Sequence, residues 1–260
     1  PSVRRRNKTV DVIPSDTVSV AVISHNYGRY LDDALCSVIE QSYQPAEILV
    51  IDDSSNDNTA EIAKDFASYG VEYIRVETKN VWTNRLIASE KLSSKWVVCL
   101  DGDNMLSQDY LLSALRVAAT DPKCGCIYPS LQRFGSDEGF RDHSRPVRNI
   151  DVQNFADASS VYRREAILQA ALHHRHPDPE ISAEDWVLAR EIVRSGWTAH
   201  HNPSLLHYRT HDSNKHSRRS KHSHFTETGY FNDAALYDDP VTIIIPLSGR
   251  HRLRPMTARW

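Results

Sequence analysis

The chain has 260 residues, of which 25% are charged and 40% hydrophobic, and its formal net charge is −3. This composition is typical of a globular protein with room for one sizeable domain or two small ones. The slightly negative charge argues against a protein that mainly coats nucleic acid. The longest apolar run is far shorter than the roughly 20 residues of a membrane-spanning helix, so we expect no transmembrane segment.

Four cysteines, Cys36, Cys99, Cys124 and Cys126, bear on the cellular compartment. Cys124 and Cys126 would suit a metal or redox pair, but no second pair of cysteines is placed to complete a site. The favoured interpretation is small, buried cysteines in a reducing compartment. This predicts a cytoplasmic location.

The first half of the chain alternates between apolar runs and segments with helical periodicity. Strands are expected at 18–23, 48–51, 71–76 and 95–100, a loop at 79–82, and helices at 30–39, 59–70, 84–92 and 107–118. Strand–helix units joined by short connections predict a parallel, doubly wound sheet.

The second half is less regular. A strand at 124–128 precedes a long loop or β-excursion at 129–154, and long loops in compact domains are usually functional or mobile. Order resumes at 158–162, followed by helices at 165–172 and 184–196 and by short strands at 197–201 and 205–208. The basic stretch 215–221 is either a flexible lid or a solvated tail.

Acidic residues follow two of the predicted strands. Asp52 and Asp53 come directly after one apolar run, and Asp101 and Asp103 end another. In open α/β sheets, ligands collect at the carboxyl ends of the strands. Two carboxylates separated by one glycine suit a divalent cation that also holds a phosphate. The alternative is a polar turn, because Asp-Gly and Asp-Asn are common turn pairs.

Several motifs, in this order, resemble those of family 2 glycosyltransferases with the GT-A fold. They are the opening strand and loop 18–27, the second-strand segments 41–48 and 50–59, the DXD motif 101–103, the segment 159–164, the acidic pair 184–185 and the late motif 208–213. The resemblance spans roughly residues 18 to 220. It implies a mostly parallel central sheet flanked by helices, with an acceptor-side second half.

The resemblance also implies a divalent cation and its ligands. Asp103 is the first choice for a metal ligand, Asp101 is expected near the ribose and as a shared ligand of the metal, and His211 would complete the shell. Histidine suits manganese better than magnesium, so Mn²⁺ is preferred to Mg²⁺. The alternative for His211 is a surface histidine in a polar tail.

The nucleotide is expected to contact three further residues. Asp52 would accept a hydrogen bond from the base, as the resemblance implies for uracil, and its alternative is a strand-end acid or a helix cap. Asn80 and Arg85 are candidates for contact with the base or the phosphates. A lone arginine on a helix is more often a solvated charge.

The acceptor side is expected at the acidic pair. Asp185 would act as the general base that takes the proton of the acceptor hydroxyl, which gives inversion at the anomeric carbon. Glu184 would orient the site. Trp186 is either an acceptor-side wall or a buried aromatic residue.

These expectations describe an enzyme that moves a sugar from a UDP- or dTDP-linked donor to a hydroxyl of a glycan or other acceptor. A location at the periphery of a membrane that carries the acceptor is the alternative to a purely cytoplasmic one. One alternative is an inactive sugar-nucleotide-binding or scaffold domain. Another is a sugar nucleotidyltransferase, which needs a glycine-rich phosphate loop after the first strand. Residues 24–29 hold one glycine and do not fit that loop or a dinucleotide-binding fingerprint.

The predicted domain organisation has four parts. Residues 1–17 form an arm or linker, 18–224 the transferase domain and 225–240 a linker. Residues 241–247 repeat the style of 18–24, so 241–260 is interpreted as the start of a second transferase domain. An edge strand of the first domain is the alternative.

Overall fold

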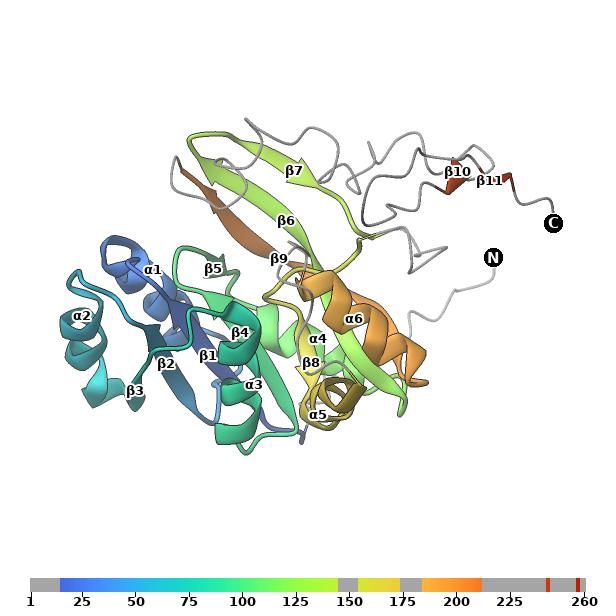
Figure 1. Ribbon diagram of the computed structural model, residues 1–260, viewed down its shortest axis with the longest axis horizontal. Helices are drawn as coiled ribbons and strands as arrows, with labels where there is room; N and C mark the ends of the chain where they lie inside the picture. The colour runs from blue at the N-terminus through green and yellow to red at the C-terminus, as the bar shows by residue number, and fades with distance from the viewer. Residues whose placement is uncertain (1–14, 145–153, 174–183, 212–241, 244–255, 258–260) are drawn as a thin grey trace, which may run out of the picture.

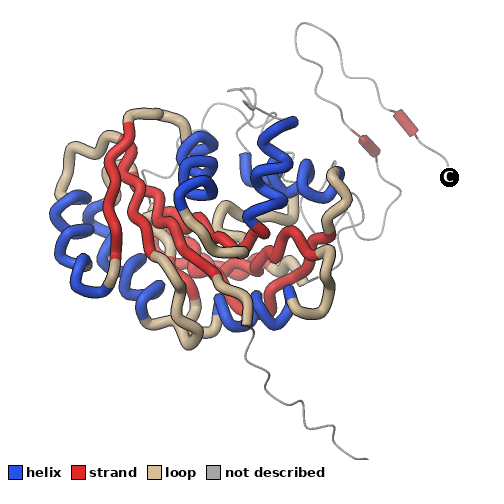
Figure 2. Tube along the Cα trace, turned by 90° about the horizontal axis from the view of Figure 1, so that it is seen from below, coloured by secondary structure: helices blue, strands red, loops and turns tan. Residues whose placement is uncertain are grey.

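The computed structural model describes residues 15–144, 154–173, 184–211, 242–243 and 256–257 (Figure 1). Within them, the main sheet contains β1 (Val18–Ser24), β2 (Ile48–Asp53), β3 (Val71–Val76), β4 (Trp96–Asp101), β5 (Met105–Leu106), β6 (Cys124–Gly135), β7 (Gly139–Arg141), β8 (Val161–Arg163) and β9 (Thr198–Thr210). The strand order is β3-β2-β1-β4-β8-β6-β9-β5, and β7 pairs with β6. Helices cover both faces of the sheet (Figure 2), which confirms the predicted α/β class.

The described helices are α1 (Gly28–Ile39), α2 (Thr59–Asp65), α3 (Val81–Lys91), α4 (Tyr110–Ala118), α5 (Arg164–His173) and α6 (Glu184–Arg194), with a 3-10 turn at Ala67–Tyr69. The expected loop at 79–82 is partly wrong, because α3 starts at Val81. Asn80 caps this helix, and its side chain accepts the Thr83 backbone N–H at 3.1 Å. The helix expected to reach Gly70 ends at Asp65 instead, and Gly70 closes the 3-10 turn with φ +81°.

Strands β1 to β4 are parallel, as predicted. Val22 of β1 lies opposite Val50 of β2 and Leu100 of β4. All residues of β1 are buried, because a central parallel strand carries helices on both faces. Alternate side chains of β1 therefore enter two cores. Val18, Val20 and Val22 pack with residues of α1 and α4, whereas Ala21 and Ile23 pack with residues of α3, α5 and α6.

The second half of the sheet differs from the predictions. β8 runs antiparallel to both of its neighbours, β4 and β6. The strand expected at 124–128 continues to Gly135 and forms a hairpin with β7, so the first part of the 129–154 segment is a β-excursion. The two short strands expected at 197–208 are one strand, β9, which pairs with β6 through a shift in register between Pro129 and Ser130. The chain takes up this irregularity without ending the strand.

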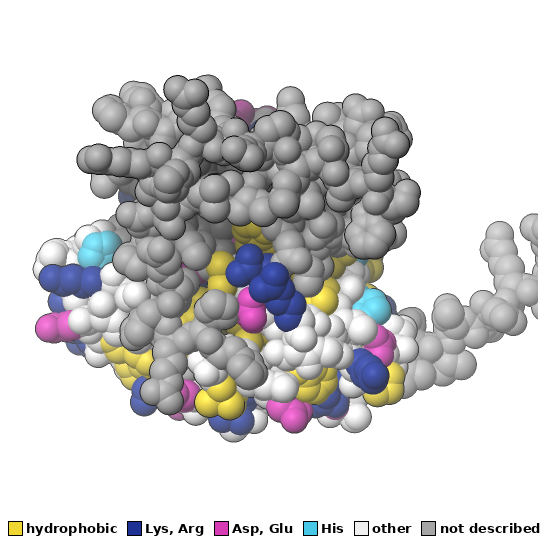
Figure 3. All heavy atoms as spheres, turned by 45° about the vertical axis from the view of Figure 1, so that its right-hand side comes forward, with side chains coloured by type: hydrophobic (Ala, Val, Ile, Leu, Met, Phe, Trp, Pro, Cys, Tyr) yellow, Lys and Arg dark blue, Asp and Glu magenta, His cyan; other side chains and the backbone are white. Residues whose placement is uncertain are grey.

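Several predictions fall outside the described residues. These are most of the 1–17 arm, the end of the 129–154 segment, the basic stretch 215–221, the linker 225–240 and nearly all of 241–260. In the last segment only β10 (Thr242–Ile243) and β11 (Met256–Thr257) are described, and they pair antiparallel. None of the helices in the described ranges is long and apolar enough to cross a membrane. Basic, acidic and hydrophobic side chains are interspersed on the described part of the face in Figure 3.

Candidate active site

The carboxyl ends of β2, β1 and β4 bring the predicted acids to one edge of the sheet. Ser24, at the end of β1, lies opposite Asp52 of β2, and Ile23 lies opposite Asp101 of β4. The two acids therefore flank the end of β1. This is the edge at which open α/β sheets bind ligands.

Asp52 is fully buried and is held by protein donors. Its Oδ1 accepts the Ser55 backbone N–H at 2.9 Å, and its Oδ2 accepts the Tyr73 hydroxyl at 2.7 Å and Arg75 Nη1 at 3.1 Å. A nucleotide base that contacts this carboxylate must share or replace one of these bonds. The predicted role in base recognition stays a prediction.

Asp53 connects the end of β2 to the turn before α3. Its Oδ1 accepts the backbone N–H groups of Thr78 and Lys79, and its Oδ2 accepts the Thr78 hydroxyl and the Asn84 amide. Burial favours the neutral acid, but these hydrogen bonds outweigh burial and lower the pKa of Asp53. Asp53 thus positions the start of α3, including the predicted contact residues Asn80 and Arg85.

The DXD segment is a tight turn against the end of β1. The Gly102 backbone N–H donates to the Ile23 carbonyl at 2.8 Å, and the Asn104 N–H donates to the Asp101 carbonyl at 3.0 Å. A Cβ at position 102 would lie 3.2 Å from the Ile23 carbonyl oxygen. Glycine permits this close approach, which turns Asp103 into the protein.

Asp103 and His211 meet despite their separation in sequence. β5 follows the DXD turn and pairs antiparallel with β9, so that Met105 lies opposite His207 and the end of β9 returns to Asp103. His211 Nε2 lies 2.9 Å from Asp103 Oδ2. Burial, followed by the Asp101 carboxylate, raises the pKa of Asp103 to about 7.

Arg209 reinforces this arrangement, and the sequence interpretation missed it. Its Nε donates to the Asp103 carbonyl at 2.9 Å, and its backbone N–H donates to Asn104 Oδ1 at 2.9 Å. Its guanidinium carbon lies 4.6 Å from the ring centre of Tyr30 and 4.5 Å from that of Phe134. The only sequence signal was its place in the late motif 208–213.

The side chain of Arg85 connects the acidic pair at the start of α6 to Asp101 of the DXD turn. Arg85 is 5% exposed, and its Nη1 lies 3.7 Å from Glu184 Oε1 while its Nη2 lies 3.8 Å from Asp101 Oδ1. A buried guanidinium needs such compensating charges. Arg85 is therefore not a solvated surface charge, and its predicted contact with base or phosphate stays a prediction.

Asp185 has the protonation behaviour of a candidate base. Its Oδ1 accepts a hydrogen bond from the backbone N–H of the next residue, Trp186, at 2.7 Å. Burial, followed by the carboxylates of Asp157 and Glu184, raises the pKa of Asp185 to about 7, although Arg85 opposes the shift. A base with a pKa near the working pH is well suited to proton transfer. Trp186 is half-buried, and the side chain of Arg190 packs 5.7 Å from its ring centre.

Asp157 is a second residue that the sequence interpretation missed. It lies just before β8 and is 8% exposed. Burial raises its pKa to about 6, and Asp101 and Arg85 act on it with opposite signs. The available signal was an acid among small and apolar residues, two positions before the motif 159–164.

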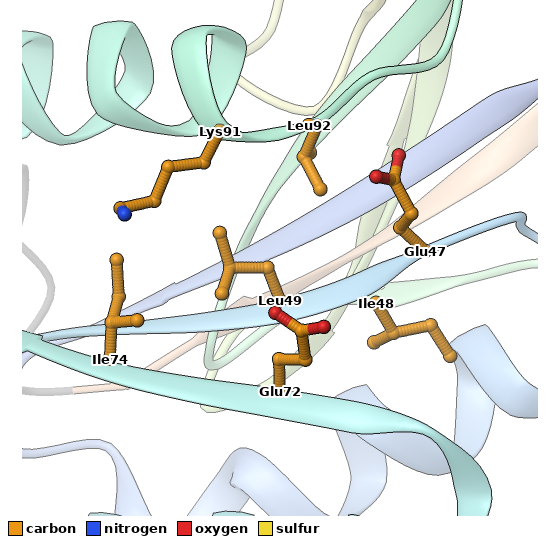
Figure 4. A pocket seen from close by; sticks show the side chains of 7 residues that line it. All are labelled: Glu47, Ile48, Leu49, Glu72, Ile74, Lys91 and Leu92. Atoms are coloured by element: carbon orange, nitrogen blue, oxygen red, sulfur yellow. The ribbon is translucent and has the colours of Figure 1, made fainter.

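A cavity of about 170 Å³ lies at the opposite edge of the sheet (Figure 4). Its lining includes Glu47 and Ile48 at the start of β2 and Leu92 just after α3. It is therefore separate from the acids at the carboxyl ends of the strands.

Comparison with known proteins assigns the family. The sequence model of Glycosyl transferase family 2 matches residues 19–176, more than half of the chain. Poly-beta-1,6-N-acetyl-D-glucosamine synthase of Staphylococcus epidermidis is 30% identical over 158 residues, which cover 60% of this chain and 37% of that protein. Glycosyltransferase GlyA of Streptococcus pneumoniae is 31% identical over 102 residues, which cover 38% of this chain and 15% of that protein. The chain thus spans well under half the length of these relatives.

Solved structures share the fold. TarS 1–349 of S. aureus in complex with UDP-GlcNAc matches with a TM-score of 0.63 and 16% identity, over 76% of this chain and 60% of that one. The mannosyltransferase PcManGT of Pyrobaculum calidifontis, in complex with GDP-Man and Mn²⁺, matches with a TM-score of 0.61 and 18% identity, over 80% and 62%. The chain belongs to glycosyl transferase family 2, and its described residues adopt the GT-A fold.

Proposed function

We propose that this chain transfers a sugar from a UDP- or dTDP-linked donor to an acceptor hydroxyl, with inversion at the anomeric carbon and with the help of a divalent cation. The observation that carries the proposal is the position of buried Arg85, whose guanidinium lies between Asp101 of the DXD turn and Glu184 of α6. Donor-side acids and a candidate base, Asp185, thereby share one site.

The side chains of Asp103 and His211, which meet at the end of β9, are suitable ligands for a cation. Asp103 offers a carboxylate oxygen and His211 an imidazole nitrogen at the same point, and this combination suits Mn²⁺ better than Mg²⁺. In the described parts of the chain, no group of three or more His, Cys, Asp or Glu side chains converges on a metal position. The remaining ligands would come from the diphosphate and water, with Asp101 near the ribose. A bound divalent cation supplies Lewis-acid stabilisation of the leaving diphosphate.

The nucleotide would occupy the edge between β2 and β4. Asp52 would accept a hydrogen bond from the base, in exchange with Tyr73 or Arg75, and Asn80 and Arg85 would contact the base or phosphates. A UDP-linked donor is supported by the bound UDP-GlcNAc in the TarS structure, and the name of the poly-N-acetylglucosamine synthase relatives supports N-acetylglucosamine as the transferred sugar. The same relatives support a glycan acceptor and a role in polysaccharide synthesis.

Asp185 would act as the general base. Its carboxylate takes the acceptor O–H proton while the acceptor oxygen bonds to the anomeric carbon and the bond from that carbon to the diphosphate oxygen breaks. Displacement on the face opposite the leaving group inverts the anomeric centre. Glu184, held beside Arg85, would keep the start of α6 in place.

A transfer assay tests this proposal. The chain would be incubated with Mn²⁺, a β-1,6-linked N-acetylglucosamine oligomer like that named for the relatives, and UDP-GlcNAc, UDP-GalNAc, UDP-glucose or dTDP-glucose. We expect release of the nucleoside diphosphate from one donor, loss of release with EDTA, and a β-linked product by proton NMR. An α-linked product or EDTA-resistant transfer would contradict the mechanism. Donor binding without transfer would favour an inactive binding domain.

A further inference from the structure

Asp157 lies beside the DXD turn because of the strand order. β8 runs antiparallel to β4, with Val161 opposite Val98. The chain that precedes Val161 therefore runs alongside the part of β4 that leads to Asp101. Asp157, four residues before Val161, is brought to the same edge of the sheet as the donor-side acids.

The carboxylate of Asp157 is held in one position. Its Oδ1 accepts the Ser159 backbone N–H at 2.9 Å, and its carbonyl accepts the Ser160 N–H at 2.9 Å and the Ser160 hydroxyl at 2.7 Å. The buried Tyr110 hydroxyl anchors the same loop by donating to the Ser159 carbonyl at 2.7 Å. Among the described residues, none of these bonds reaches Oδ2, so Oδ2 is the oxygen that could accept from a ligand.

The carboxylate also lies among the groups proposed for the reaction. Its charge acts on Asp103 and on Asp185, and the charges of Asp101 and Arg85 act on it. Asp157 is thus close enough to both the donor-side acids and the candidate base to interact with their charges.

Arg85 gives an independent sign of a polar ligand. It is 5% exposed, and its Nε and Nη1 make no hydrogen bond with the described residues, although Nη1 lies 3.7 Å from Glu184. Buried donors are nearly always satisfied, by protein, water or a ligand. The guanidinium lies between Asp101 and Glu184, so its unused donors belong to the same region as Asp157.

The chemistry of displacement identifies the ligand. The anomeric carbon must lie between the leaving diphosphate, near Asp103, and the base, Asp185. A fixed carboxylate near both points is within reach of the sugar ring, whose hydroxyl groups donate hydrogen bonds. We propose that Asp157 is a specificity-determining residue that accepts a hydrogen bond from a hydroxyl of the transferred sugar, an inference that rests on the function proposed above.

Donor binding without acceptor isolates this contact. Dissociation constants would be measured by calorimetry for UDP and for UDP-GlcNAc, UDP-GalNAc and UDP-glucose, with Mn²⁺. In Asp157→Asn, which keeps an oxygen for the Ser159 N–H, we expect the ratio of the UDP-sugar constant to the UDP constant to rise about tenfold or more. Asp65→Asn, the same substitution at an exposed acid that ends α2 away from the site, is the matched control, and its ratio should stay within about twofold of wild type.

An unchanged ratio in Asp157→Asn would overturn the inference, whether the variant is otherwise normal, equally weakened for UDP and UDP-sugar, or impaired only in its KM for the acceptor. If wild type transfers sugar but the ratio does not change, the proposed function stands and the inference fails. If wild type binds none of the nucleotides, the proposed function itself fails.

Deoxy analogues of the preferred donor provide a second measurement that does not depend on the folding of the variant. On wild type, we expect one analogue, which lacks the hydroxyl bound by Asp157, to bind about tenfold more weakly than the parent. In Asp157→Asn, the same analogue should bind no worse than the parent, because the two changes remove one interaction. Full-strength binding of every deoxy analogue to wild type would overturn the inference.

Discussion

Asp52 and Asp53 are neighbours in sequence but differ in their surroundings. Both carboxylate oxygens of Asp53 accept hydrogen bonds from the turn before α3 and from α3 itself, with two backbone and two side-chain donors in all. Asp52 points to the Tyr73 hydroxyl and half-exposed Arg75. Because Arg75 is half-exposed, a nucleotide could exchange with this partner of Asp52. An acid pair at a strand end thus divides between a structural residue and a candidate binding residue.

The raised pKa of Asp185 predicts the pH dependence of transfer. Asp157 and Glu184 disfavour its ionised form and Arg85 favours it, with a pKa of about 7 as the result. The base must be ionised, so kcat should rise with pH through about 7 and then level off. A pH–rate profile measures this, with Asp185→Asn as the variant that should lose the ionisation from its residual rate. A wild-type profile that is flat between about pH 5.5 and 8.5 would contradict the role.

The raised pKa of Asp185 also predicts that the stability of the fold decreases as pH rises, whereas the rate of transfer increases. The pKa of Asp185 is raised from 3.8 to about 7 in the folded chain, so the folded state binds more protons than the unfolded state between these values. The free energy of unfolding therefore falls as pH rises through that window. Between about pH 5 and pH 8, the free energy of unfolding should fall in both proteins. The fall should be smaller in Asp185→Asn than in wild type, by about 1 kcal/mol or more. Urea denaturation at both pH values measures the difference, and parallel losses would contradict it.

At the scale of elements, β9 brings His211 to the DXD turn. It pairs with β6 along its length and with β5 at the DXD turn, and it ends where His211 meets Asp103. Tyr30 of α1 packs against His211 with ring centres 5.0 Å apart. The position of His211 therefore depends on strand pairing and on α1, not on its local sequence.

Arg209→Lys tests the support that β9 gives to Asp103. Lysine cannot lie flat between Tyr30 and Phe134 while it donates to the Asp103 carbonyl. We expect the concentration of Mn²⁺ needed for half-maximal activity to rise about threefold to tenfold, in line with the loss of roughly one hydrogen bond. A titration of activity with Mn²⁺ measures this. Arg116→Lys, on the exposed face of α4, is the control, and an equal effect in both variants would contradict the prediction.

Gly28→Ala tests the contact between the starts of α1 and α2. The Gly28 N–H donates to Asp57 Oδ2 at 2.9 Å, and a Cβ at position 28 would lie 2.1 Å from Asn58 Oδ1 and 2.9 Å from the Thr59 backbone nitrogen. Overpacking of this kind should destabilise the fold by about 1–3 kcal/mol. Thermal unfolding would show a lower Tm. Gly70→Asn is the control, because its Cβ would meet nothing within 4 Å and asparagine tolerates positive φ; equal losses would contradict the packing argument.

At the scale of the whole molecule, the sequence predicted what depends on local pattern. The strands β1 to β4 are apolar runs whose burial on both faces leaves a continuous signal. β5 and β8 have two and three residues, too few for a period, and they form because long-range pairing supplies their hydrogen bonds. The antiparallel direction of β8 was therefore not predictable from its residues.

The same limit applies to the site. Asp101, Asp103 and Asp185 could be proposed as site residues from motifs, because each motif is contiguous in the chain. Asp157 has no such mark, since its significance comes from burial beside residues of β4 and α6. Arg85 was identified, but its burial between Asp101 and Glu184 required the packing of α3 against the rest of the fold.

The central claim is that the donor-side acids and Asp185 act in one site to transfer a sugar. The most direct test is the rate of UDP release from the preferred UDP-sugar, with Mn²⁺ and acceptor, by wild type and Asp185→Asn side by side. We predict that Asp185→Asn binds UDP as wild type does, while its kcat falls about 10²- to 10⁴-fold. Equal kcat values for the two proteins, at equal UDP affinity, would contradict the account.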